Sequence, residues 1–359
     1  MYITIILYIF GPVCAVEIED MVLKEKKIKA VIPVAGVGTK LRPHTFTQPK
    51  PLIPVAGKPI ISHIIDQFLK VGIDDFVVII GYLGDKIRQY VIETYPQIKV
   101  EFIYQERRLG LGHAIWTASE AFQDADELVI VLGDTIVDLN FDAFLKISGS
   151  CVGVSTVKTP SEFGIVEVGS YGFISKAVEK PNVPTSNLAI VGIYKLDNVP
   201  NLIAALNGII EVATETDDEL QLTDALMSMI KDGEKISIFH VNKWFDCGKR
   251  EVLLETNATL LSLIDSPSVD LESFEQAIII HPVAIGENCT IKNSIIGPNV
   301  TIGPNSTIVS SVVDNSIIGS FAELKEIVLR KSIVGNDASV KGHYVSLNIG
   351  ENTEIEFGK

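Results

Sequence analysis

The sequence is poor in cysteine, and its few cysteines stand far apart. Among the 359 residues there are four, Cys14, Cys151, Cys247 and Cys289, and no two of them form a C-x-x-C pair. We therefore expect neither a disulfide framework nor a cysteine-based zinc site. Scattered cysteines are typical of proteins that keep their thiols reduced, so we expect a cytoplasmic protein.

Positive charge is also scarce. The chain has 30 Lys and Arg residues against 45 Asp and Glu residues, which gives a net charge of -15 and a pI near 4.9. Nucleic acids and anionic membrane surfaces need a basic face, so we expect neither as a partner. An acidic protein that binds an anionic ligand must concentrate its cations in one place.

No apolar run is long enough to cross a membrane. Residues 1–10 are apolar, but they fall short of the ~20 residues that a spanning helix needs, and no basic region precedes them. The following segment Val16–Asp20 is acidic, and Met21, just before Lys24–Lys27, would be a natural start. We expect residues 1–27 to be a disordered extension, with an export signal as the alternative.

Cations do gather around one glycine-bearing turn. The apolar run Ala30–Val34 predicts a buried strand, and Gly36 and Gly38 follow it. Glycines let backbone N–H groups approach a ligand closely, and successive exposed amides form an anion-binding concavity. The loop behind them carries Lys40, Arg42 and Lys50. The pattern indicates a clamp for a polyphosphate at the carboxyl end of a strand.

Two better-known glycine motifs are missing from this turn. The Walker pattern fails because Thr39 and then Lys40 follow Gly38. The dinucleotide pattern G-x-G-x-x-G fails because its third glycine is absent. The clamp is therefore of another type.

The segment Pro33–Thr39 resembles the signature loop of the sugar-1-phosphate nucleotidyltransferases, also called nucleotide-sugar pyrophosphorylases. Its form is most similar to the UTP–glucose-1-phosphate uridylyltransferases and glucose-1-phosphate thymidylyltransferases. Further segments agree in order within residues 28–261: Gln105–Ala114, Gly133–Asp134, Glu179–Tyr194, Glu219–Ala225 and Asp246–Gly248. One departure is Lys40, where the family usually has Arg. Lysine keeps the charge but lacks the planar, bidentate fork.

Behind the signature loop, apolar strands alternate with amphipathic helices. The patterns predict helices at 60–71, 85–95 and 112–122, and strands at 76–80, 100–104 and 127–132. This alternation indicates an α/β fold with a mostly parallel sheet covered on both faces, and such sheets bind ligands at the carboxyl ends of their strands. The resemblance implies a Rossmann-like domain of the nucleotide-diphospho-sugar transferase type over residues 28–262.

After residue 262 the pattern becomes a repeat. Aliphatic residues recur at intervals of about six, with Asn, Asp, Ser and Gly between them, which predicts a parallel β-helix. It resembles the left-handed hexapeptide-repeat domain attached to several nucleotidyltransferases. We expect a linker at 263–276 and a short left-handed β-helix at 277–359.

The repeat domain leaves three possible roles. We expect it to hold a homo-oligomer together, because repeat stacks serve as extended interaction surfaces. A bifunctional enzyme with hexapeptide acyltransferase activity is the alternative, and it would need a catalytic histidine such as His281 or His343. A sensor of sugar nucleotides without catalysis is the third possibility.

The resemblance assigns roles to individual residues. The nucleotide-binding residues would be Ala35, Gly36, Gly38, Thr39, Gln105 and Gly110. The residues of the sugar-phosphate side would be Gly164, Glu179, Lys180, Asn187 and Gly192, and the catalytic cations Lys40, Arg42, Lys50 and Lys180. Asp134 and Asp246 would hold Mg²⁺, which prefers hard oxygen ligands and phosphate oxygens. The amide of Gln105 offers a donor and an acceptor that match the imide edge of uracil or thymine.

The implied reaction needs no covalent intermediate and no general base. The phosphate oxygen of a sugar 1-phosphate attacks the α-phosphorus of a nucleoside triphosphate, and pyrophosphate leaves. Catalysis is then a matter of positioning and charge neutralisation. We expect UTP or dTTP with glucose 1-phosphate; a guanylyltransferase that uses GTP and mannose 1-phosphate is the alternative.

Overall fold

The computed structural model describes residues 26–213, 219–263 and 274–342. The extension predicted at 1–27 and the linker predicted at 263–276 lie almost entirely outside these ranges, and His343 lies outside them. Within them, none of the helices combines the length and the apolar character that a membrane crossing requires. The three cysteines of the described part, Cys151, Cys247 and Cys289, are all free.

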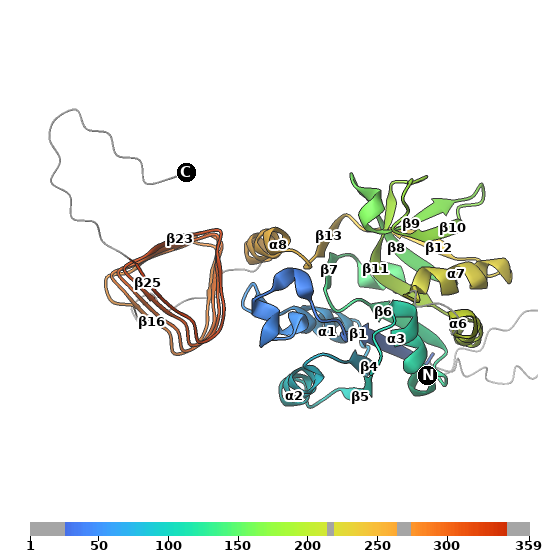
Figure 1. Cartoon of the computed structure of the whole chain (residues 1–359), viewed down its shortest axis with the longest axis horizontal. Helices are drawn as coiled ribbons and strands as arrows, with labels where there is room; N and C mark the ends of the chain where they lie inside the picture. Colours follow the sequence, from blue (N-terminus) through green and yellow to red (C-terminus); the bar gives the residue numbers. More distant parts are fainter. Residues whose placement is uncertain (1–25, 214–218, 264–273, 343–359) are drawn as a thin grey trace, which may run out of the picture.

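The first domain is built on one large sheet (Figure 1). Its main path runs β10-β9-β11-β6-β1-β4-β5, and β8 joins β11 to β12. The pairs β6-β1, β1-β4 and β4-β5 are parallel, whereas β11 runs antiparallel to β6. The strands are β1 (Ile28–Pro33), β4 (Asp75–Ile80), β5 (Lys99–Tyr104), β6 (Glu127–Val131), β8 (Cys151–Thr156), β9 (Gly164–Val168), β10 (Ile174–Glu179), β11 (Leu188–Leu196) and β12 (Ser237–His240).

Helices cover both faces of this sheet, as its sequence predicts. Alternate residues of β1 enter different cores: Ile32 joins one cluster and Val31 the other. The first core includes the apolar stripe of α1, where burial of each large side chain contributes roughly 1.5–3 kcal/mol. The helices are α1 (Ile60–Lys70), α2 (Gly84–Thr94), α3 (Leu111–Thr117), α4 (Ser119–Phe122), α5 (Phe141–Leu145), α6 (Val199–Ala213), α7 (Leu222–Lys231) and α8 (Arg250–Leu263).

Short elements surround the carboxyl ends of the parallel strands. The stretch that continues from the signature loop folds into three 3-10 turns, η1 (Thr39–Leu41), η2 (His44–Phe46) and η3 (Lys50–Leu52). It then forms the small hairpin of β2 (Pro54–Val55) and β3 (Lys58–Pro59). A separate two-stranded sheet pairs β7 (Thr135–Asp138) with β13 (Lys243–Asp246). A further 3-10 turn, η4 (Pro160–Glu162), precedes β9.

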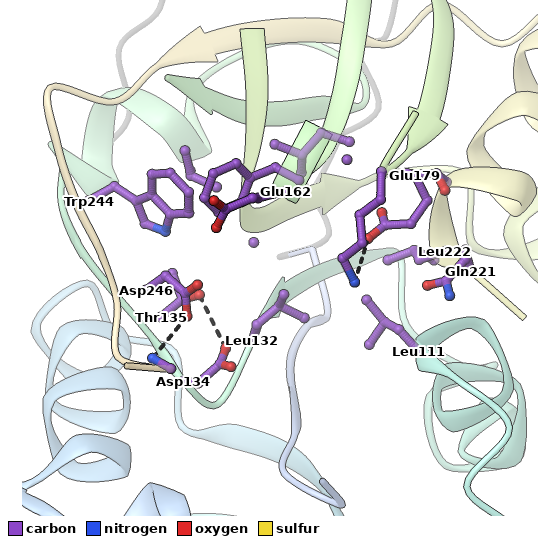
Figure 2. A pocket seen from close by; sticks show the side chains of 18 of the residues that line it. Leu111, Leu132, Asp134, Thr135, Glu162, Glu179, Gln221, Leu222, Trp244 and Asp246 are labelled. Carbon is purple, nitrogen blue, oxygen red and sulfur yellow. Dashed lines mark hydrogen bonds and ion pairs between the residues drawn. The ribbon is translucent and has the colours of Figure 1, made fainter. Parts of the chain in front are cut away.

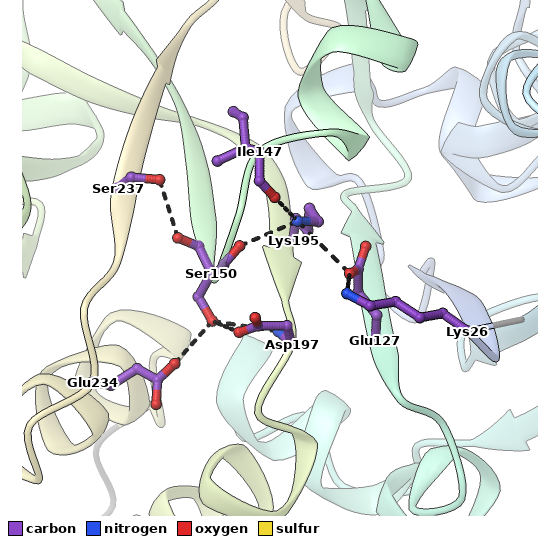
Figure 3. Close-up of polar contacts among 9 residues, drawn as sticks. Lys26, Glu127, Ile147, Ser150, Lys195, Asp197, Glu234 and Ser237 are labelled. Atoms are coloured by element: carbon purple, nitrogen blue, oxygen red, sulfur yellow. Dashed lines mark hydrogen bonds and ion pairs between the residues drawn. The ribbon is translucent and has the colours of Figure 1, made fainter. Parts of the chain in front are cut away.

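A buried ion pair lies at the other end of the strands, where β6 begins (Figure 3). Lys195 at the end of β11 is 1% exposed, and its Nζ lies 3.7 Å from Oε2 of Glu127, the first residue of β6. Lys195 also donates to the backbone carbonyls of Ile147 and Gly149. These bonds tie two strands and the loop before β8 together far from the carboxyl ends.

The second domain is a parallel β-helix of three sheets, which confirms the predicted left-handed hexapeptide fold. Stacked aliphatic residues form its core, and asparagines with positive φ, such as Asn299 and Asn315, turn its corners. The strands are β14 (Ile278–Ile279), β15 (Val283–Ile285), β16 (Thr290–Lys292), β17 (Ile295–Ile296), β18 (Val300–Ile302), β19 (Thr307–Val309), β20 (Val312–Asp314), β21 (Ile317–Ile318), β22 (Glu323–Lys325), β23 (Val328–Arg330), β24 (Ile333–Val334) and β25 (Ser339–Lys341).

The three faces of the β-helix differ in character. The face β15-β18-β21-β24 contacts the first domain, where Ile317 and Ile333 join the core of that domain. The face β16-β19-β22-β25 points polar side chains outward. The face β14-β17-β20-β23 instead carries an outward aliphatic column, defined here as the aliphatic ladder: Ile278, Ile295, Val312 and Val328, paired in register. Its two end members are 58% and 64% exposed.

Candidate active site

A cavity of about 460 Å³ lies at the carboxyl ends of the strands (Figure 2). It is bounded by the signature loop, by β7 and β13, and by residues of β9 to β11. Predicted site residues from all three groups meet in its lining: Gly38, Thr39, Lys40, Lys50, Asp134, Gly164, Glu179, Lys180, Gly192 and Asp246. The other predicted residues, Ala35, Gly36, Arg42, Gln105, Gly110 and Asn187, are not among the residues that line it.

The signature loop after β1, which the sequence predicts to bind phosphate and which is called the phosphate loop below, has a shape that requires glycine at one position. Gly38 has φ +69°, and a Cβ there would lie 3.1 Å from side-chain carbons of Thr45 and Lys50. Thr45 Oγ1 donates to the carbonyl of Gly38 over 2.9 Å. By contrast, a Cβ on Gly36 would meet nothing within 4 Å. The fold therefore leaves open space at Gly36, where a ligand can approach the backbone.

The predicted cations are placed differently from one another. Lys40 and Lys50 line the cavity, and Lys50 is largely buried. Arg42 is exposed and stacks its guanidinium over the ring of Phe46, with 4.9 Å between the guanidinium carbon and the ring centroid. In this structure Arg42 thus covers the outer side of the loop.

Two carboxylates stand beside Lys50. Lys50 Nζ lies 2.6 Å from Oδ2 of Asp134, just after β6. The β7-β13 pairing sets Asp246 opposite Thr135, and the backbone N–H of Cys247 donates to the carbonyl of Asp134 over 2.9 Å. Burial, and secondly the negative charge of Asp134, raise the pKa of Asp246. Two acids close enough to influence each other's ionisation are the kind of site that attracts a cation.

The donor set fits magnesium. Within the described residues no group of three or more His, Cys, Asp or Glu side chains gathers to enclose a metal. Mg²⁺ is usually bound by one or two carboxylates together with water and substrate phosphates. Asp134 and Asp246 would supply the protein's share of such a shell.

The residues predicted to read the base lie next to the cavity. Gln105 is 5% exposed, and its Nε2 donates to the carbonyl of Gly110 over 3.2 Å and lies 3.0 Å from His113 Nδ1. Gly110 has φ +96°, and a Cβ there would lie 2.4 Å from the carbonyl oxygen of Leu220. Only glycine fits at this position, and the amide of Gln105 has a fixed orientation.

The sugar side contains a close-packed acid and a strained lysine. A Cβ on Gly164 would lie 2.7 Å from Oε2 of Glu179, so glycine leaves the room that this carboxylate occupies. Lys180 pairs with Glu179 over 3.4 Å and has φ +38°, a conformation that costs energy for a residue with a side chain. Asn187 is exposed, and its backbone carbonyl accepts from Val157.

Two of the lining residues to which the sequence assigned no role carry unpaired polar atoms. The Oγ1 of Thr223 and the Nε1 of Trp244 are buried and have no hydrogen-bond partner within the described residues. A buried polar atom without a partner costs about 1–3 kcal/mol, so both are suited to bind a polar ligand. The residue order contains no sign of this, because each atom is unpaired only in the folded arrangement.

Comparisons with known proteins agree with this geometry. The family model described as Nucleotidyl transferase matches residues 29–262. Over 331 residues the chain is 34% identical to the bifunctional protein GlmU of Methanococcus maripaludis. This alignment covers 91% of this chain and 74% of that protein. Over 339 residues it is 30% identical to a glucose-1-phosphate thymidylyltransferase of Streptomyces antibioticus, covering 90% of this chain and 93% of that one.

A solved structure shares the fold. The UDP-glucose pyrophosphorylase of Acinetobacter baumanii superposes with a TM-score of 0.57 and 22% identity, over 68% of this chain and 97% of that one. At this identity the likeness concerns the fold alone.

Proposed function

Because this chain belongs to the nucleotidyl transferase family, we propose that it transfers the nucleotidyl group of UTP or dTTP to a sugar 1-phosphate, with glucose 1-phosphate as the favoured sugar. The products are a nucleoside diphosphate sugar and pyrophosphate. The observation that carries this proposal is one cavity whose lining brings three ammonium groups, Lys40, Lys50 and Lys180, together with the neighbouring carboxylates Asp134 and Asp246. Such a site suits two anionic substrates and a divalent cation.

The cations would overcome the repulsion between the two substrates. Lys40 and Arg42 are proposed to hold the triphosphate with the amides of the phosphate loop, whose open space at Gly36 admits it. Lys50 and Lys180 would draw the attacking phosphate towards the α-phosphorus. The rate gain then comes from orientation and charge neutralisation. When bound at Asp134 and Asp246, Mg²⁺ would neutralise the charge that develops on the phosphate oxygens.

The sugar would be held by Glu179 and by the two unpaired polar atoms of the lining. Glu179 can accept hydrogen bonds from ring hydroxyls. Trp244 Nε1 can donate, and Thr223 Oγ1 can do both, which would satisfy the two buried atoms that have no partner. Gln105 is proposed to read the pyrimidine edge, a role supported by its fixed position beside Gly110.

The names of the relatives bear on the substrates. A thymidylyltransferase of similar length supports a pyrimidine nucleotide and glucose 1-phosphate. The word bifunctional in the name of the other relative favours a second activity, for which acyl transfer by the β-helix is our candidate. Of the two histidines that the sequence offers for acyl transfer, His281 lies within the described residues, whereas His343 does not.

The test is a matrix of pyrophosphate release. UTP, dTTP, GTP and ATP are each paired with glucose, mannose and N-acetylglucosamine 1-phosphates, with and without Mg²⁺. We expect turnover with UTP or dTTP and glucose 1-phosphate, and only with the metal. Preference for GTP with mannose 1-phosphate would favour the guanylyltransferase, and no release with any pair would contradict the proposal. Thiol release from acetyl-CoA with amino-sugar phosphates tests the second activity separately.

A further inference from the structure

The β-helix contacts the segment that carries the catalytic lysine, and it does so at two places. This segment, residues 44–57, starts at η2 and ends in the turn between β2 and β3, with Lys50 near its middle. On the β-helix side the contacts come from the face β15-β18-β21-β24 and the corners beside it. A cavity of about 280 Å³ lies beside the first place, with Ile53 and Pro54 on one side and Ile333 and Val334 on the other.

The first contact is a continuous chain of hydrogen bonds, called here the amide relay. The backbone N–H of Ser320 donates to Asn336 Oδ1 over 2.9 Å, and Asn336 Nδ2 donates to Gln48 Oε1 over 2.7 Å. Gln48 Nε2 then donates to the carbonyl of Leu52 over 2.7 Å. Each amide uses one acceptor and one donor, so the relay connects the β-helix backbone to η3, the turn that begins at Lys50.

The second contact is a buried asparagine on α8. Asn257 is 1% exposed, and its Oδ1 accepts from the backbone N–H of Ala56 over 2.9 Å and from Thr301 Oγ1 over 2.6 Å. Its Nδ2 donates to the carbonyl of Asn299 over 3.1 Å. Ala56 has φ +49°, an unfavourable conformation for alanine, so its backbone depends on such a bond.

Apolar packing supports the same connection. Ile317 of the β-helix is 1% exposed and belongs to the core that contains Leu41 and Leu52, the last residues of η1 and η3. The turns that present Lys40 and Lys50 to the substrates therefore rest on a core that the second domain completes.

We propose that the β-helix positions Lys50 for catalysis, with Gln48 and Asn336 as the positioning residues; this rests on the proposed role of Lys50 in the transfer. The side chain of Lys50 is long and flexible, and holding it costs conformational entropy. A fixed η3 backbone restricts where its ammonium group can go. The relay thus gives the repeat domain a part in nucleotidyl transfer, although none of its described residues, 274–342, lines the active-site cavity.

The experiment uses full-length variants in which one bond of the relay is lost. Gln48→Ala, Asn336→Ala and the double variant are compared with Gln89→Ala. Gln89 is a matched control, because its side-chain amide also makes one exposed hydrogen bond: Nε2 donates to Glu93 Oε1 over 2.9 Å on α2. We expect each relay variant to lower kcat about five- to tenfold, the loss of roughly one hydrogen bond, at an unchanged Tm. The double variant should fall no further, and the control should match the wild type.

Exchanging the two amide residues, Gln48 and Asn336, distinguishes a role in positioning Lys50 from a purely structural role. Gln48→Asn combined with Asn336→Gln conserves the combined length of the two side chains, so it should restore most of kcat, whereas Gln48→Asn alone should not. Additive losses in the double alanine variant, or wild-type kcat in both single variants, would overturn the inference.

Two further measurements keep this inference distinct from the proposed function. Lys50→Ala should lose activity whether or not the relay matters, so wild-type rates in the relay variants beside an inactive Lys50→Ala would refute only the relay. Hydrogen exchange of peptides covering residues 44–57 reports on the backbone without any turnover. Faster exchange in Asn336→Ala supports positioning by the β-helix, and unchanged exchange contradicts it.

Discussion

At the scale of single residues, Lys50 and Asp134 form an ion pair. Their 2.6 Å contact involves the carboxylate that we propose as a metal ligand. We propose that Asp134 exchanges Lys50 for the metal when the substrates bind, while Lys50 turns to phosphate. The pair keeps the cavity from holding an isolated buried charge, which would cost several kcal/mol.

The carboxylate of Asp134 can be tested by an isosteric change. Asp134→Asn keeps the shape but removes the charge, so kcat should fall by about 10²-fold or more, as for the loss of a group that stabilises developing charge. Steady-state pyrophosphate release measures this, with circular dichroism as the control for folding. A folded Asp134→Asn enzyme with near wild-type turnover would refute the metal assignment.

The signature loop offers a gain-of-function test. Lys40→Arg restores the family's usual residue and a bidentate donor for phosphate, so we expect activity that equals or exceeds the wild type.

Lys180→Ala should instead raise KM for the sugar phosphate and leave KM for the triphosphate nearly unchanged. If kcat and both KM values of Lys180→Ala match the wild type, Lys180 is a surface charge.

Ten of the predicted site residues line the cavity, but the sequence did not reveal the unpaired atoms of its lining. Gly38, Lys50 and Asp134 follow strands, and strand ends converge in an α/β sheet. Thr223 and Trp244 come from α7 and β13, and only the packing of these elements reveals that their polar atoms lack partners. Arg42, Gln105 and Asn187 lie off the lining, and their roles stay predictions.

At the scale of elements, the helix predicted at 112–122 is divided. The structure has α3 (Leu111–Thr117) and α4 (Ser119–Phe122), with Ala118 between them in a non-helical conformation. Thr117 Oγ1 donates to the carbonyl of His113 over 2.8 Å, and such a bond to the preceding turn bends helices. The helix α1 and the strand β4 agree with prediction to within a residue, because a strong apolar pattern defines them.

The helix α1 contains a pH-sensitive residue. Burial lowers the pKa of His63 from 6.5 to about 4, and its Nε2 bonds to the carbonyl of Val55. Between those values the unfolded chain binds more protons than the folded one, so stability falls as pH drops from 6.5 to 4, by about 3 kcal/mol in total. Denaturant unfolding across this range should show the loss, and His63→Gln should make it shallower; equal slopes would contradict the assignment.

The pairing of β6 with β11 depends on the buried ion pair of Figure 3. Lys195→Met removes the buried countercharge of Glu127 and leaves it the more exposed Lys26, whose Nζ lies 3.3 Å from the same Oε2. It should destabilise the protein by up to about 3 kcal/mol. The double variant with Glu127→Gln should recover part of this loss. Chemical denaturation measures both, and a smaller loss in the single variant than in the double would rule out the coupling.

At the scale of the whole molecule, the aliphatic ladder indicates how copies associate. It lies on a face of the β-helix that the first domain does not cover and whose outward residues are aliphatic apart from the ion pair of Asp314 and Arg330. We predict a homo-oligomer built on this face, so Val328→Lys should lower the oligomeric state. Light scattering decides this, with Thr307→Lys on the polar face as control. A monomeric wild type, or a Val328→Lys variant of unchanged mass, would contradict the prediction.

The corner that carries Asn336 has an evolutionary consequence. A stack of coils can lengthen at a free end, because a new coil needs only its neighbour for support. It cannot shorten with the same freedom here, because losing the coil of Asn336 would remove a bond to Gln48, and losing the coil of Asn299 would remove a bond to Asn257 of α8. We therefore expect relatives of this protein to gain repeats more readily than they lose coils within the stack.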